Sequence, residues 1–270
     1  MRRPEPSTVR WGILVAILLL WQFLPATEII PELFLPSLTS TLKVLYSDRY
    51  IYFAALLVTV YEVAFAMLIA CGGGILIGSL VGGLTVLRNL LLPIFSSLYA
   101  VPLVILYPIF TAWFGIGSES KIAFAGIYGF FPVMLSTAAG IRTIDPQFIL
   151  AARSMGATLP QQIVRVIIPA SVPTVFTGLR LGGALTIIGV VVSEMLTSAA
   201  GIGYLVTLNR TIQDSARVYA AILMIMILAV AYYMVARAIE RRMVVWQSAG
   251  RQQKTSARDN AAGVPAAAAA

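Results

Sequence analysis

The sequence contains no histidine and a single cysteine, Cys71, in 270 residues. Without an imidazole there is no Ser-His or Cys-His nucleophile, no His-ligated zinc and no histidine proton relay. One cysteine forms neither an intrachain disulfide nor a thiolate cluster, and its setting within a Gly-rich apolar run is typical of a small packing residue. We therefore predict no catalytic residue, no metal and no cofactor.

Charged residues are also scarce. They make up 11% of the chain, whereas a soluble domain has about 25%. Hydrophobic residues reach 59% and the mean hydropathy is +0.90. This apolar excess indicates that most apolar side chains face membrane lipid rather than the core of a soluble domain.

The few lysines exclude one way of using ATP. None of Lys43, Lys121 and Lys254 follows a glycine, as the G-x-x-x-x-G-K-[ST] phosphate loop requires. The chain is therefore not expected to hydrolyse ATP by that route. The pI of 9.9 comes mainly from arginines beside apolar runs, not from a basic face interleaved with aromatics, so nucleic acid is not an expected partner.

Six apolar runs predict an all-α membrane protein, because a spanning helix needs about 20 mostly apolar residues. The runs cover residues 11–25, 53–84, 90–114, 122–141, 172–196 and 218–239. The first also has the layout of a signal peptide, but Leu24-Pro25-Ala26-Thr27 is a poor cleavage site, which favours an uncleaved span. We predict a short N-terminus (1–10), a membrane domain (11–246) and a disordered, low-complexity tail (247–270).

Glycines and prolines mark two of these runs. Gly74, Gly78 and Gly82 recur every four residues, which predicts a helix face that a second helix approaches closely. The third run contains three prolines, Pro102 among them. Each one frees a backbone carbonyl, so this run is expected to be irregular where protein or water can satisfy it.

The distribution of positive charge predicts the orientation. With both termini on the cytoplasmic side, fourteen Lys and Arg residues fall inside and five outside. Short cytoplasmic loops are rich in Lys and Arg. The count favours an N-in, C-in topology with the loop 142–169 in the cytoplasm.

That loop carries strong local signals. Asp145 is a good N-cap and Pro146 suits the first helical position. Gly156 can adopt the left-handed conformation that closes a helix. Thr158 and Gln161 form a capping box for a second short helix. Two short helices joined by a sharp glycine turn are therefore expected.

The first of these helices presents an apolar face. It carries Phe148, Ala151, Ala152 and Met155 at helical spacing. Two interpretations compete. In one the segment is an ordinary connecting loop with an amphipathic helix. In the other the alanine pair and the tight turn let the loop fit closely into the groove of a partner.

The loop resembles that of the permease subunits of binding-protein-dependent ABC importers. Their loop carries Glu-Ala-Ala, a glycine four residues after the second alanine, and then Ile-x-Leu-Pro. This chain has Ala151-Ala152, Gly156 and a Val-Ile-Ile-Pro segment ending at Pro169. It departs from the pattern at Leu150, where the family usually has glutamate.

The resemblance covers about residues 56–238. The segments 100–102, 178–180, 193–195 and 201–205 are similar to the subgroup that imports nitrate, sulfonates and taurine. It implies a type I importer fold with six transmembrane helices in the bacterial inner membrane. It also implies two ATP-binding subunits, a second permease copy in a homodimer, and an extracytoplasmic substrate-binding protein.

The same resemblance implies alternating access driven by the partner ATPases. The residues expected to couple ATP use to the spans are Ala151, Ala152, Gly156 and Ala157, with Pro169 fixing the return into the fifth span. The membrane lipid is the remaining expected partner.

Four residues within the spans are candidates for the translocation path, since ionisable groups at that depth are costly. Glu194 is either a path or gating residue, or an interfacial glutamate that caps the helix before the turn 201–204. For Glu62 a structural pairing with a neighbouring helix is favoured. Arg180 is a stepping stone for an anion or extends to the interface. Gly182 either lines the path or allows close packing.

The substrate stays open at this point. Arg180 is the only basic residue expected in the core of a span, so a neutral heterocycle such as a vitamin or pyrimidine precursor competes with a sulfonate, taurine or nitrate. An ion-coupled secondary transporter using Glu62 and Glu194 would be expected to show inverted repeats, and none is found. An intramembrane enzyme lacks the necessary acid-base pairs.

Overall fold

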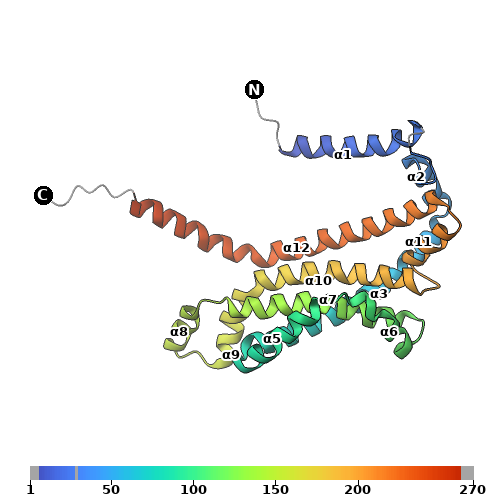
Figure 1. Cartoon of the computed structure of the whole chain (residues 1–270). Coiled ribbons are helices and arrows are strands. Elements are labelled where there is room, and N and C mark those ends of the chain that lie inside the picture. The colour runs from blue at the N-terminus through green and yellow to red at the C-terminus, as the bar shows by residue number, and fades with distance from the viewer. Residues whose placement is uncertain (1–5, 28–29, 263–270) are drawn as a thin grey trace.

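The computed structural model describes residues 6–27 and 30–262, and every regular element in those ranges is a helix (Figure 1). The α-helices are α1 (Pro6–Phe23), α2 (Leu38–Ser47), α3 (Arg49–Met67), α4 (Gly74–Gly83), α5 (Thr85–Tyr99), α6 (Tyr107–Phe114), α7 (Ser118–Arg142), α8 (Pro146–Ser154), α9 (Leu159–Gln162), α10 (Ile168–Leu196), α11 (Ile202–Thr211) and α12 (Ser215–Ala262). The π-helical turns Leu68–Gly73 and Ile163–Ile167 connect α3 to α4 and α9 to α10. An all-α fold is confirmed.

Four helical segments are long and apolar enough to cross a membrane. They are Arg49–Gly83, Ser118–Arg142, Leu159–Leu196 and Ser215–Met243. They correspond to the second, fourth, fifth and sixth predicted spans. Each begins earlier in the sequence than expected, most of all the fifth, which starts at Leu159 because α9 continues into α10.

The other two predicted spans differ from the expectation. The third span is broken: the axes of Thr85–Tyr99 and Leu103–Phe114 differ in direction by 86°. Pro102 lies between them and has no backbone N–H to continue the hydrogen bonds of the first helix. The first contributes only the shorter apolar helix Trp11–Phe23 within α1. The described helices thus support four spans, or five if the bent pair counts as one, and the predicted number of six is not confirmed.

Small residues let the central helices pack closely. A Cβ atom placed on Gly78 of α4 would lie 2.6 Å from the carbonyl oxygen of Met134 in α7. One placed on Gly182 of α10 would lie 2.7 Å from the carbonyl oxygen of Gly129, also in α7. Only glycine permits these approaches, so α7 lies between α4 and α10 as the centre of the bundle. The helix-facing role predicted for Gly78 is confirmed.

The helices α7 and α10 lie side by side and connect two ends of the molecule (Figure 1). At one end lie α8 and α9, which we call the loop end. At the other end lie α6 and α11, which we call the far end. Both ends are therefore built on the same rigid pair of helices.

The C-terminal tail differs from its prediction. The helix α12 continues through Ala262, so the described part of the predicted tail, 247–262, is helical rather than disordered. This stretch lacks proline and is rich in Ala, Gln and Arg, which favour helix. Residues 263–270, like residues 1–5 of the predicted N-terminal segment, lie outside the described residues.

Candidate functional site

Of the two short helices expected at the loop end, α8 is separate as predicted, whereas α9 continues through the π-helical turn Ile163–Ile167 into α10 and does not end at Pro169. The carboxylate of Asp145 accepts a hydrogen bond of 2.9 Å from the backbone N–H of Gln147 and caps α8. Gly156 has a φ of +75°, a conformation that L residues rarely adopt, and it ends α8. The N–H of Ala157 then donates to the carbonyl oxygen of Ala152 at 3.0 Å. The predicted N-cap and glycine turn are confirmed.

The second short helix, α9, is also held as expected. The side-chain oxygen of Gln161 accepts from the backbone N–H of Thr158 at 2.9 Å. A further contributor that was not predicted is Gln162. Its buried amide donates to the carbonyl oxygen of Ala157 at 2.8 Å and accepts from Arg153 at 3.4 Å. No sequence signal distinguishes it from the adjacent exposed Gln161.

An apolar hollow of about 730 Å³ lies between α8, the beginning of α10 and α12. The predicted face of α8 lines it with Phe148, Ala151, Ala152 and Met155. Pro169 lines it from α10 and Met243 from α12. Of the five predicted coupling residues, Ala151, Ala152 and Pro169 thus face one hollow, while Gly156 and Ala157 shape the turn beside it.

The charge around this hollow is positive. Arg165 and Arg242 line it, and Arg153 lies exposed on α8. The nearby acidic side chain, Asp145, is engaged at the N-cap. Leu150 is 65% exposed and does not line the hollow. The loop end therefore presents an apolar and basic surface.

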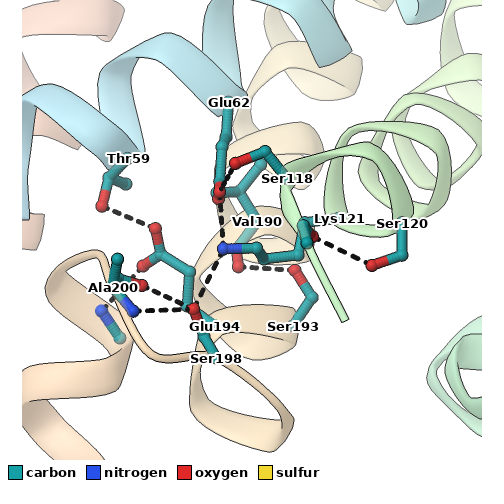
Figure 2. Close-up of polar contacts among 12 residues, drawn as sticks. Thr59, Glu62, Ser118, Ser120, Lys121, Val190, Ser193, Glu194, Ser198 and Ala200 are labelled. Carbon is teal, nitrogen blue, oxygen red and sulfur yellow. Dashed lines mark hydrogen bonds and ion pairs between the residues drawn. The ribbon is translucent and has the colours of Figure 1, made fainter. Parts of the chain in front are cut away.

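The far end contains a buried charged cluster (Figure 2). The ammonium of Lys121 in α7 lies 2.5 Å from Oε1 of Glu62 in α3, and both side chains are almost fully buried. The hydroxyl of Ser118 donates to the same carboxylate oxygen at 2.8 Å. Oε2 of Glu62 has no hydrogen-bond partner within the described chain. The pairing of Glu62 with a neighbouring helix agrees with the favoured expectation.

The second carboxylate of the cluster is Glu194, near the end of α10. The hydroxyl of Thr59 donates to its Oε1 at 2.7 Å, and the backbone N–H of Gly203 donates to its Oε2 at 2.7 Å. The N–H of Ile202 donates to Thr59 at 2.9 Å. The first N–H groups of a helix have no partner inside it. Glu194 and Thr59 supply those partners for α11, the helix after the turn. The capping alternative placed an interfacial Glu194 at the end of the helix before the turn, and the structure differs from it because Glu194 is 1% exposed and caps the following helix.

The turn between α10 and α11 is attached to the same cluster. Lys121 donates to the hydroxyl of Ser198 at 3.0 Å, and that hydroxyl donates to the carbonyl oxygen of Ala200 at 2.6 Å. Lys121 was not among the predicted site residues, and the structure places it at the centre of the cluster. Its partners lie in other helices, so the local pattern contains no signal for them.

The remaining two path candidates lie elsewhere. Arg180 forms an ion pair with Glu240 of α12, and Gly182 contacts the backbone of Gly129. The structure thus brings Glu62 and Glu194 into one cluster but leaves Arg180 and Gly182 apart from it. Each of the four has a structural partner in the chain, and a role in translocation stays a prediction.

The apolar bundle, its central α7–α10 pair and the capped loop define a membrane subunit of a transporter. The chain belongs to the family described as binding-protein-dependent transport system inner membrane component, whose model matches residues 74–245. It is therefore the permease subunit of an ABC importer in the inner membrane, and not an enzyme.

Several proteins of known name are similar over most of the chain. The putative aliphatic sulfonates transport permease protein SsuC of Bacillus subtilis is 29% identical over 255 residues, covering 91% of this chain and 92% of that protein. The taurine transport system permease protein TauC of Escherichia coli is 30% identical over 247 residues, covering 88% and 90%. These similarities confirm the predicted resemblance to permeases for sulfonates, taurine and nitrate.

A solved structure shows the same fold. A chain of the MetNI methionine ABC transporter, in an inward-facing conformation, matches with a TM-score of 0.65 at 16% identity. The match covers 73% of this chain and 98% of that chain. The type I importer fold is confirmed by this similarity.

Proposed function

We propose that this permease forms, together with a second copy of itself, the translocation path for a small solute of the sulfonate, taurine or nitrate type. An extracytoplasmic binding protein delivers the solute, and two ATP-binding subunits dock at the loop end. The observation that carries the docking role is the apolar hollow lined by Ala151, Ala152 and Pro169 beside the glycine turn.

The choice of solute is supported by relatives that cover nearly the full chain and are named for aliphatic sulfonates and taurine. A second candidate, a neutral heterocycle, is supported by two shorter matches. A riboflavin transport permease of Chloroflexus aurantiacus is 31% identical over 162 residues, and a formylaminopyrimidine transport permease of Halalkalibacterium halodurans is 30% identical over 155 residues.

The two candidates are separated by uptake into vesicles. The permease is reconstituted with the ATP-binding subunit and binding protein encoded beside it, and taurine, butanesulfonate, nitrate and riboflavin are offered in turn. ATP-dependent uptake of taurine, butanesulfonate or nitrate, with riboflavin excluded, supports the first proposal. Uptake of riboflavin alone supports the second, and uptake of either compound without the ATP-binding subunit contradicts both.

The docking role is tested at Gly156. A Cβ there would meet nothing within 4 Å, so Gly156→Val acts through its disfavoured positive φ and not through a clash. We expect ATP-dependent uptake to fall at least tenfold while membrane insertion is unchanged. Gly83→Val is the matched control, since it also enters open space and has no positive φ. Normal transport by Gly156→Val would contradict the docking role.

A further inference from the structure

A second hollow opens at the loop end, between the beginning of α5 and the end of α7. It has a volume of about 440 Å³ and is lined by Arg88, Asn89, Leu92, Pro93 and Arg142. Two guanidinium groups from different helices therefore face one space. Neither residue belongs to the five predicted coupling residues or to the apolar hollow beside α8.

These two arginines differ from the basic residues paired inside the bundle. The ion pairs among residues 6–27 and 30–262 neutralise Lys121, Arg180 and Arg217. None of them includes Arg88 or Arg142. Arg88 makes a long side-chain contact of 3.4 Å with the hydroxyl of Thr85. Both guanidinium groups thus keep donors available for a ligand.

A separate hollow of about 460 Å³ adjoins the first at Pro93 and is lined further by Ile94, Ser97, Leu98 and Val101. Leu92 and Ile94 are two positions apart on α5 and do not share a helix face, so this second hollow lies on another side of the helix. The apolar lining of the first hollow is therefore supplied by Leu92 and Pro93.

We propose that Arg88 and Arg142 bind the oxyanion head of a ligand whose apolar stem contacts Leu92 and Pro93. A guanidinium presents a planar fork of donors that matches sulfonate or phosphate oxygens. Asn89 adds an amide donor beside them. The ligand is an alkanesulfonate leaving the path or the phosphate and acyl chain of an anionic phospholipid. The alkanesulfonate alternative rests on the proposed function.

This site supplies the positive charge that the bundle interior lacks. Lys121, the buried cation among the described residues, and the half-buried Arg180 are each paired with a carboxylate. Two arginines outside the ion pairs that line one hollow raise the local concentration of anions. An anion would then be attracted to the loop end without a fixed charge inside the bundle.

Binding is measured on the full chain in nanodiscs of phosphatidylcholine, by calorimetric titration with butanesulfonate, inorganic sulfate and butanol. We expect butanesulfonate to bind more tightly than sulfate, and butanol not to bind. In Arg88→Gln and Arg142→Gln the affinity for butanesulfonate should fall about tenfold each, the effect of losing one charge-assisted hydrogen bond. Arg88→Lys, which keeps the charge but not the fork, should fall between wild type and Arg88→Gln.

A second arm tests the lipid. The chain is exchanged into nanodiscs containing phosphatidylglycerol, and the retained lipid is counted by native mass spectrometry. Loss of bound phosphatidylglycerol in the double variant supports the phospholipid alternative, and loss of butanesulfonate binding supports the alkanesulfonate. If the double variant retains both, the proposal is wrong. Equal binding of sulfate and butanesulfonate would contradict the apolar stem.

The control is Arg210→Gln, an exposed arginine of α11 at the far end that is in none of the ion pairs described above. It should leave both binding signals unchanged. The experiment contains no ATP-binding subunit, so it does not depend on ATP-driven uptake. Failure of uptake with intact butanesulfonate binding would count against the proposed function and leave the site standing.

Discussion

The two ends of the α7–α10 pair differ in whether their charged side chains have partners within the chain. At the far end Glu62, Lys121 and Glu194 are buried and bonded to one another or to neighbouring groups. At the loop end Arg88 and Arg142 line a hollow without forming an ion pair within the described chain. The charged groups of the far end are neutralised or hydrogen-bonded within the chain except for Oε2 of Glu62, whereas the two arginines of the loop end remain able to bind other molecules.

Because of this difference, substitutions at the two ends are expected to change different measured properties. Breaking a buried ion pair by removing one partner costs about 3–5 kcal/mol, because the other charge stays buried. Exposed ion pairs and surface substitutions change stability by about 0–1 kcal/mol. Substitutions at the far end should therefore change the stability of the permease, and those at the loop end should change its coupling or binding.

The largest effect is expected at Lys121. Lys121→Met leaves Glu62 buried without its cation, and we expect the free energy of unfolding to fall by about 3–5 kcal/mol. The measurement is unfolding of the purified chain in detergent. Lys43→Met, an exposed lysine, is the control. Adding Glu62→Gln to Lys121→Met should recover part of the lost stability. An unchanged free energy of unfolding in Lys121→Met would contradict the claim that Lys121 neutralises a buried Glu62.

The next effect is expected at Glu194. Glu194→Ala leaves the buried N–H of Gly203 without its acceptor, at about 1–3 kcal/mol for the unsatisfied group, whereas the hydroxyl of Thr59 can still donate to the carbonyl oxygen of Ala55 at 3.2 Å. The turn after α10 should loosen. It is followed by the labelling rate of Ala199→Cys, an exposed position, in a Cys71→Ser background. Glu194→Gln retains one acceptor oxygen and should label more slowly than Glu194→Ala; equal rates would rule out the capping role.

At the loop end a larger side chain should affect coupling without unfolding the chain. Ala152→Leu projects into the apolar hollow, which has room for it. We expect the free energy of unfolding to change by less than about 1 kcal/mol, and ATP-dependent uptake to fall because the partner is displaced. Gln147→Leu, exposed on α8 outside the hollow, is the matched control. Normal uptake by Ala152→Leu would indicate that the hollow is not the docking surface.

The smallest effect is expected at Leu150, where the family usually has glutamate. Leu150 is largely exposed and lies outside the lining of the hollow. Leu150→Glu should change stability by less than about 0.5 kcal/mol and leave uptake nearly unchanged. A strong loss of uptake would extend the docking surface to this face of α8.

The loop end was largely predictable, whereas the far end was not. The cap at Asp145, the turn at Gly156 and the apolar face of α8 depend on residues within one or two helical turns of each other. The contact between Thr59 and Glu194 joins residues 135 positions apart. Their types allowed several roles, and only the packing of α3 against α10 selected one.

The sequence by itself determined the apolar helices, the irregularity of the third run and the capped loop, because backbone conformation and local hydrogen bonds depend on near neighbours. The tertiary structure decided that Lys121 meets Glu62, that Arg180 meets Glu240, and that Arg88 shares a hollow with Arg142. Which charges are neutralised and which stay available depends on the helix faces that come together. That outcome arises from close packing around α7, which brings together side chains far apart in the chain.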